Sequence, residues 1–179
     1  MMNKPAGYVC SAVSDSHHTV YELLPPELQD LVQNAKRGQR LHTVGRLDCD
    51  TSGLLLLTTD GNFSHNLTAP ENEITKTYIA ELQAPGSPDY INRAAAGLLL
   101  PAEKKAPEQL AASAGVCPLN DSLTLWQVTV TEGKFHEVRR IFRALGNEVV
   151  NLKRTSMGPY QLPENLEAGK FVEFSPTTL

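Results

Sequence analysis

Asp48 lies in a segment whose residue types could carry out covalent chemistry. Residues 45–53 read GRLDCDTSG and run directly into four leucines at 54–57. Glycines at both ends and an apolar run behind the segment would mount a carboxylate on a rigid element. An ionised aspartate in such a place can attack an electrophilic carbon, so Asp48 is the candidate nucleophile.

A nucleophilic carboxylate must stay ionised even though burial raises its pKa. An arginine within a few ångströms counters burial and lowers the pKa by roughly 1–3 units. Arg46 is one candidate partner, provided that the loop is extended, because side chains two residues apart then share a face. The arginines of segment 136–143 are equally good candidates. A turn or cap aspartate is the competing interpretation, since aspartate is common in loops for that reason alone.

A second hypothesis pairs Asp48 with Asp50, either for acid–base catalysis or for binding a metal. Such a site needs further oxygen ligands, and Asp60, the only nearby acid, is explained by a turn or a helix cap. Neighbouring His17 and His18 have no cysteine or acid cluster beside them. The sequence therefore predicts no metal site and no cofactor, and no phosphate-binding glycine loop is present.

Composition narrows the class of protein. The chain has 179 residues, 41% of them apolar, which suits one domain or two small halves sharing a core. No apolar run approaches the roughly 20 residues that cross a membrane, and the start of the chain lacks the apolar core of a signal peptide. The three cysteines are widely spaced, which is typical of reduced thiols. A cytoplasmic protein with no membrane partner is expected.

Positive charge is clustered although the formal net charge is −4. Segment 134–154 holds six Lys or Arg and two acids, and a second group precedes the candidate nucleophile at Lys36, Arg37, Arg40 and Arg46. A local basic field on an acidic body can hold a phosphate backbone. The alternative is an ordinary solvated face.

The elements expected to position these residues alternate between helix and strand. The clearest helix spans 135–145, with Val138, Ile141, Phe142 and Leu145 at helical spacing and Gly146 as the stop. Other helices are expected from Pro26 to residue 32, after Asp60 and from Pro88 to Gly97. Strands are expected at 41–44, 54–58, 75–82, 123–130, 148–152 and 171–174. This order indicates an α+β fold with a largely antiparallel sheet and helices packed on it.

Several segments together resemble one family, the bacterial RsuA-type ribosomal RNA pseudouridine synthases. The matching segments are NKPAG at 3–7, HTVYELLP at 18–25, GRLD with TSGLLLLTTDG between 45 and 61, KTY at 76–78, EGKFHEVRR at 132–140, and LKR with MG between 152 and 158. They occur in the family's order and cover almost the whole chain. The resemblance implies the pseudouridine synthase catalytic fold, a largely antiparallel mixed sheet flanked by helices with a central RNA-binding cleft.

The resemblance also implies residue roles. Asp48 would act at the anomeric carbon of the target ribose, and Arg139 would pair with it. Tyr78 would stack on the target base and assist removal of the proton from carbon 5. Arg46 would hold the flipped nucleotide, and Leu152 would form an apolar wall of the base pocket. Further RNA contacts are expected from four residues: Lys76, His136, Arg140 and Arg154.

The resemblance predicts the substrate and the organisation of the chain. Uridine in 16S rRNA is favoured, free or within an assembling small subunit, and the alternatives are a 23S rRNA enzyme or a non-catalytic assembly factor. Residues 1–179 would form one catalytic domain, with halves of about 1–84 and 85–179 sharing one sheet, acting as a monomer. The RNA-binding domain that usually precedes it is expected to be absent. Phe135 and Glu137 depart from the family's usual tyrosine and glutamine, and Glu137 would add negative charge to an RNA-facing helix.

Overall fold

One mixed sheet runs through the computed structural model, which describes residues 1–14, 16–103 and 105–176. Its strand order is β1 (Met2–Lys4), β5 (Thr51–Leu55), β12 (Val149–Met157), β7 (Lys76–Leu82), β11 (Leu125–Val130) and β10 (Gly115–Pro118), and β13 (Tyr160–Gln161) pairs with β12. Within this sheet as described, β5 and β12 run parallel and the other pairs are antiparallel. The predicted α+β class with a largely antiparallel sheet is confirmed.

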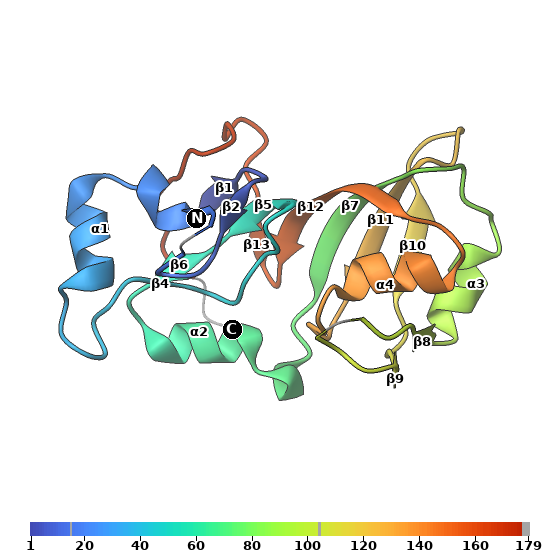
Figure 1. The fold of residues 1–179 in the computed structure, drawn as a ribbon, viewed down its shortest axis with the longest axis horizontal. Helices are drawn as coiled ribbons and strands as arrows, with labels where there is room; N and C mark the ends of the chain where they lie inside the picture. Colours follow the sequence, from blue (N-terminus) through green and yellow to red (C-terminus); the bar gives the residue numbers. More distant parts are fainter. Residues whose placement is uncertain (15, 104, 177–179) are drawn as a thin grey trace.

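Short elements surround this sheet on both sides of the β12–β7 pair (Figure 1). On one side lie the small pairs β2–β3 (Tyr8–Val9, His18–Thr19) and β4–β6 (His42–Thr43, Leu57–Thr58), with α1 (Pro26–Gln33) and α2 (Gly61–Thr68). On the other lie α3 (Tyr90–Ala95), α4 (Glu137–Ala144) and the β8–β9 pair (Leu99–Leu100, Gln109–Leu110). Two 3₁₀ turns, at Val20–Leu23 and Pro70–Asn72, complete the described elements.

The core divides in the same way. The fully buried Trp126 of β11 packs against Phe142 of α4 and Tyr90 of α3. Separate clusters around Leu55 and Leu54 lie on the side of α1 and α2. The apolar run behind Asp48 is therefore buried, as the sequence predicts, with Leu54, Leu55 and Leu56 all at 0% exposure.

Local signals placed several elements correctly. Asp60 accepts hydrogen bonds from the backbone N–H groups of Asn62 and Phe63 and caps α2. Pro26 occupies the first turn of α1. The expected helix at 135–145 forms at 137–144, and the strands expected at 75–82 and 123–130 form at 76–82 and 125–130.

Other boundaries were wrong. No strand forms at 171–174, where Phe171 makes only an isolated bridge to Met2. The leucine run does not form one strand; β5 begins at Thr51, and Leu56 separates it from β6. The helix expected from Pro88 begins at Tyr90, and the strand expected to end at residue 152 continues to Met157. Long-range pairing decides these boundaries, and propensity alone does not report it.

Candidate active site

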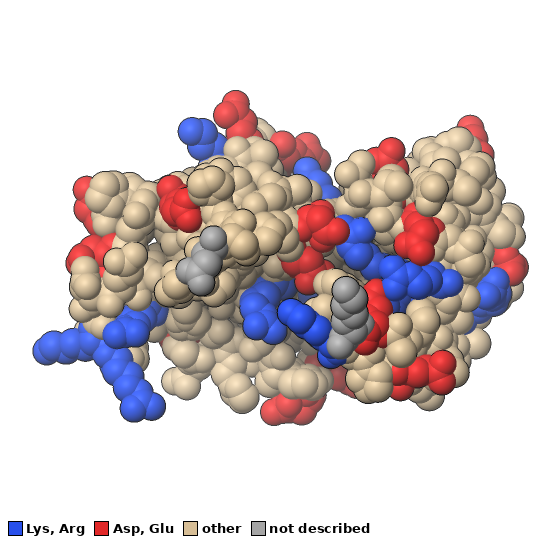
Figure 2. Space-filling model, in the orientation of Figure 1, with Lys and Arg blue, Asp and Glu red and all other residues tan. Residues whose placement is uncertain are grey.

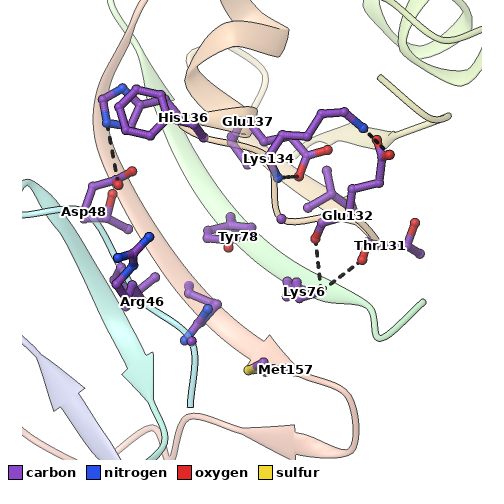
Figure 3. Close-up of a pocket in the computed structure, with 18 of the residues that line it drawn as sticks. Arg46, Asp48, Lys76, Tyr78, Thr131, Glu132, Lys134, His136, Glu137 and Met157 are labelled. Carbon is purple, nitrogen blue, oxygen red and sulfur yellow. Dashed lines mark hydrogen bonds and ion pairs between the residues drawn. The ribbon is translucent and has the colours of Figure 1, made fainter. Parts of the chain in front are cut away.

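A cavity of about 690 Å³ opens between the loop that carries Asp48, strands β7 and β12, and the turn before α4 (Figure 3). Most of the residues predicted from the sequence line it: Arg46, Asp48, Lys76, Tyr78, His136, Arg139, Leu152 and Arg154. They come from four segments that are far apart in the chain. The fold therefore collects the candidate chemistry in one place, and Arg140 is the one predicted site residue that it leaves out.

Lys4 anchors the loop that carries Asp48, a role that the sequence reasoning missed. The residue is fully buried, and its Nζ donates to the backbone carbonyls of Asp48 at 3.0 Å and Thr51 at 2.7 Å. Two further carbonyls, of Pro5 and Cys49, accept from the same ammonium. Burial lowers the pKa of Lys4. The NKPAG segment gave no local signal of this role, because lysine is rarely buried and its acceptors lie more than 40 residues away, at Asp48 and Thr51.

Asp48 sits at the cavity wall with 37% of its side chain exposed. Burial raises the pKa of its carboxyl, and the nearby charge of His136 opposes that effect. Asp50 raises the pKa further, while Arg139 and Lys4 lower it. The Nε2 atom of His136 lies 3.6 Å from Asp48 Oδ1, so the two side chains are close enough to form an ion pair when the imidazole carries a proton on each nitrogen.

Arg139 does not make the direct ion pair with Asp48 that the resemblance implied. Its Nη2 lies 2.9 Å from Asp50 Oδ2, and its Nη1 donates to the carbonyl of Val149 at 2.9 Å. Because α4 begins at residue 137, His136 at its start faces Asp48, whereas Arg139 lies about one turn further along, over Asp50. Arg139 still lowers the pKa of Asp48 through its charge.

Tyr78 faces the cavity from β7, directly across the ladder from Arg154 on β12. Burial raises the pKa of the Tyr78 phenol, while the charge of Arg154 and a hydrogen bond from it lower the pKa. Arg154 is only 3% exposed and donates through Nε to the carbonyl of Leu54 at 2.9 Å. A guanidinium buried in this way helps to position Tyr78. Because Arg154 also lines the cavity, its predicted contact with RNA stays a prediction for the cavity interior and not for the outer surface.

The predicted RNA contact of Arg140 is wrong. The residue has 0% exposure and lies on the core side of α4, outside the cavity lining. Its guanidinium donates to the carbonyls of Pro101 at 2.9 Å and Pro107 at 2.7 Å, with longer bonds to two other carbonyls. Backbone acceptors from a segment more than 30 residues upstream satisfy it, so Arg140 supports the loop before β9 and cannot face RNA.

Lys76 and Arg46 differ in whether protein groups already bind their charged ends. Lys76 Nζ donates to the carbonyls of Thr131 at 2.9 Å and Glu132 at 3.0 Å, which ties β7 to the turn after β11. Arg46 is exposed at the cavity, and no hydrogen bond or ion pair engages it within the described ranges. Arg46 is therefore the cation best placed to meet an incoming anion, in keeping with its predicted role.

Glu137 does not lie on an outward, RNA-facing surface, although the sequence had suggested that it would. The residue is 7% exposed and lines the cavity. One carboxylate oxygen accepts from the backbone N–H of Lys134 at 3.3 Å. Burial raises its pKa to about 7, helped by the charge of Glu132 and opposed by Lys134 and Lys76. Because the first residue of α4 turns inward, its carboxyl contributes to the cavity interior.

Replacing Glu137 by glutamine should change how stability depends on pH. The ordinary pKa of 4.5 applies in the unfolded chain, and the folded value is about 7. Between these values the folded protein binds a proton that the unfolded chain has lost, so stability is full below pH 4.5 and falls as pH rises to 7. Glu137→Gln removes this loss. The free energy of unfolding of the variant, relative to that of the wild type, should therefore rise by about 3 kcal/mol between pH 4.5 and pH 7.

Urea unfolding at several pH values between 4 and 8 measures this difference. Glu108→Gln is the matched control, because Glu108 is exposed and should leave the pH profile unchanged. Parallel profiles for wild type and Glu137→Gln would contradict a buried, protonated Glu137.

Comparison with known proteins identifies the family. The family model described as RNA pseudouridylate synthase matches residues 1–144. The chain belongs to the RNA pseudouridylate synthase family. Ribosomal small subunit pseudouridine synthase A of Haemophilus influenzae is 39% identical over 171 residues, covering 96% of this chain and 67% of the relative. The Escherichia coli K12 protein of the same name is 36% identical, with coverage of 96% and 68%.

Solved structures of pseudouridine synthases share the fold. A crystal structure of pseudouridylate synthase matches with a TM-score of 0.80 and 40% identity, covering 94% of this chain and 66% of that one. A Cbf5-Nop10-Gar1 complex matches with a TM-score of 0.58 at 20% identity, which supports the fold alone. This chain spans about two thirds of the length of the curated relatives that it matches.

Among the described residues, no three His, Cys, Asp or Glu side chains group closely enough to hold a metal ion. The helices in the described part of the chain are too short or too polar to cross a bilayer.

Proposed function

We propose that this chain converts a specific uridine of 16S ribosomal RNA to pseudouridine, with Asp48 as the catalytic carboxylate. The observation that carries the proposal is the convergence of Asp48, Tyr78 and Leu152 on one cavity in a member of this family. Relatives named for the ribosomal small subunit support 16S rRNA over 23S rRNA as the substrate. We place this activity in the cytoplasm and expect a monomer forming one catalytic domain.

The reaction is an isomerisation, so every atom of the uridine is retained. In one route, the Asp48 carboxylate attacks carbon 1′ of the ribose and the bond from carbon 1′ to nitrogen 1 breaks. In the other route, Asp48 takes the ribose 2′ proton as that bond breaks. The freed uracil then turns in the pocket, and its carbon 5 bonds to carbon 1′. In the first route this step breaks the bond between Asp48 and carbon 1′ and releases the carboxylate, and in the second route Asp48 returns the proton to carbon 2′. The proton then leaves carbon 5 and nitrogen 1 gains one.

The cavity supplies what each step needs. Leu152, at 5% exposure, gives an apolar surface against which a planar base can turn. Tyr78 can stack on the base and assist the transfer of the proton from carbon 5. Asp48 keeps a partly exposed carboxylate beside His136. The proposed roles of Tyr78 and Asp48 are tested by the variants Tyr78→Phe and Asp48→Asn.

RNA has to deliver a uridine that has left its stack, at a cost of a few kcal/mol. Contacts to flanking phosphates can offset that cost. Exposed cations project from the segment between α1 and β4, namely Lys36, Arg37 and Arg40. Figure 2 shows Lys and Arg side chains both in that region, at the lower left, and across the middle of the face. We propose that RNA crosses this face, with Arg46 at the cavity holding the flipped nucleotide.

Tyr78→Phe separates stacking from proton transfer. Phenylalanine keeps the ring that would lie under the base, so RNA binding should change less than threefold, about 0.7 kcal/mol at most. Loss of the hydroxyl should slow pseudouridine formation by about 10²-fold or more, the usual contribution of a positioned acid or base. Single-turnover assays on 16S transcript, with binding measured by filter retention, report both quantities. A variant with the full wild-type rate would show that the hydroxyl has no part in the reaction.

Mapping pseudouridine in total ribosomal RNA tests the function itself. A strain lacking the gene should lose pseudouridine at one 16S position, and the intact gene should restore it. Loss of a 23S site instead would assign the large-subunit alternative. An unchanged map, together with no activity of purified protein on 16S transcript or small-subunit particles, would favour the non-catalytic assembly factor.

A further inference from the structure

Glu103 makes a contact behind the catalytic centre that none of the family motifs includes. Its Oε2 lies 2.9 Å from Nδ1 of His136, and the Nε2 of the same ring lies 3.6 Å from Asp48 Oδ1. The imidazole therefore bridges two carboxylates that are 55 residues apart in the sequence. Only 14% of the Glu103 side chain is exposed, so the bridge is shielded at that end.

Arg143 and Phe135 hold this bridge in place. Arg143, on α4, forms an ion pair with Oε1 of Glu103 through Nη1 and contacts Glu148 through Nε at 3.2 Å. The Phe135 ring stacks on the His136 ring with centroids 3.8 Å apart and planes 20° apart. Burial opposes ionisation of Glu103, but hydrogen bonds from Arg143 and His136 outweigh it and lower its pKa. Glu103 is thus an ionised, fixed carboxylate.

The backbone at His136 also fits a constrained role. His136 adopts a left-handed conformation, with φ of 48° and ψ of 34°, just before α4 begins. Residues other than glycine adopt this region only when the surroundings hold them there. The contacts to Glu103 and Phe135 supply that restraint, and they direct the far ring nitrogen toward Asp48.

An imidazole flanked by two carboxylates has an acceptor facing each nitrogen. Neutral histidine carries one N–H, so one of these contacts would then place a lone pair against an oxygen. The doubly protonated ring satisfies both contacts at once. A cation held in this way favours the charged form of Asp48, which the proposed reaction requires.

We infer that Glu103 is a positioning residue of the catalytic centre, which holds His136 as a cation beside Asp48 and thereby keeps Asp48 ionised. The inference rests on the proposed function of Asp48. The other groups that act on Asp48 are Asp50, Arg139 and Lys4, and none of them contacts Glu103 in the described structure. Substitution at Glu103 should therefore act on Asp48 through His136.

Glu103→Gln tests the inference, with Glu148→Gln as its matched control. Both substitutions remove one carboxylate partner of Arg143, but only Glu103 contacts His136. On the acid limb of the pH profile, Glu103→Gln should lower kcat for pseudouridine formation by about tenfold, because less Asp48 is ionised at a given pH. KM for RNA should stay within about twofold, a difference of 0.4 kcal/mol. Glu148→Gln should match wild type in both.

The pH profile distinguishes this role from general loss of structure. Asp48 must be ionised, and weaker cationic character at His136 raises the pH at which Asp48 loses its proton. The acid limb of the kcat profile should therefore move up by about one pH unit in Glu103→Gln. Glu103→Asp keeps the charge one methylene further back, so a smaller upward shift is expected. In a His136→Gln background, Glu103→Gln should add no further loss, because the two act as one unit.

Carbon-13 NMR of the Asp48 carboxyl keeps the inference testable without catalysis. Its titration midpoint should be higher in Glu103→Gln than in wild type and unchanged in Glu148→Gln. If wild type forms pseudouridine while Glu103→Gln leaves the profile and the midpoint unaltered, the inference is overturned. Equal effects of the two variants would overturn it as well. A shifted midpoint in a chain that forms no pseudouridine would leave the electrostatic link standing and remove the proposed function.

Discussion

Asp48→Asn is expected to abolish pseudouridine formation, with a loss of about 10⁴-fold or more, as for removal of other catalytic nucleophiles. An amide of the same size neither attacks carbon 1′ nor accepts the ribose 2′ proton, so both routes fail. RNA binding should hold, because the variant removes a negative charge from a cavity that receives an anionic ligand. The fold should hold as well, because Lys4 binds the backbone carbonyl of Asp48 and not its side chain.

Release of tritium from carbon 5 of labelled uridine in 16S transcript measures this loss under single-turnover conditions. Asp60→Asn is the matched control, since asparagine also caps helices and Asp60 lies outside the cavity lining. Asp50→Asn separates the two loop carboxylates. Appreciable turnover by Asp48→Asn, combined with an inactive Asp50→Asn, would move the nucleophile to Asp50 and revive the paired-carboxylate hypothesis.

Gly53→Ala is expected to be the most destabilising single methyl addition at the site. Gly53 has φ of 101° and pairs with Arg154 where β5 and β12 run parallel. A Cβ built there would lie 2.1 Å from the carbonyl oxygen and 2.8 Å from the amide nitrogen of Arg154. Both are backbone atoms, so relief requires the two strands to separate. Left-handed strain and overpacking each cost 1–3 kcal/mol, which together predict a loss of about 3 kcal/mol or more.

Thermal unfolding should show the loss as a fall in Tm of roughly 10 °C for a chain of this length. Gly61→Ala is the control, since nothing lies within 4 Å of its added Cβ and residue 61 opens α2. That variant should be neutral or slightly stabilising, as alanine is in helices. A Gly53→Ala protein with wild-type Tm would contradict the close approach of β5 and β12 behind the Asp48 loop.

The sequence by itself determined the local elements and the family. Asp60 as a cap, Pro26 in the first turn of α1 and the helical spacing of Val138 and Ile141 depend on neighbours within a few residues. Such signals act at short range, so they are legible in the chain. The ordered motifs also predicted pseudouridine synthase membership, which the comparisons confirm. The predicted gathering of Asp48 and Tyr78 in one cavity followed from that membership and from no local rule.

Only the tertiary structure decided how the charges are paired. Arg139 forms an ion pair with Asp50, and His136 faces Asp48. Arg140 donates hydrogen bonds to backbone carbonyls of a distant loop. The helical pattern gives each of these residues a direction around α4, but the partner depends on which loop packs there. Burial makes an unpaired charge costly, so each one takes the acceptor that the fold brings near. That choice is made by long-range packing, which residue spacing does not encode.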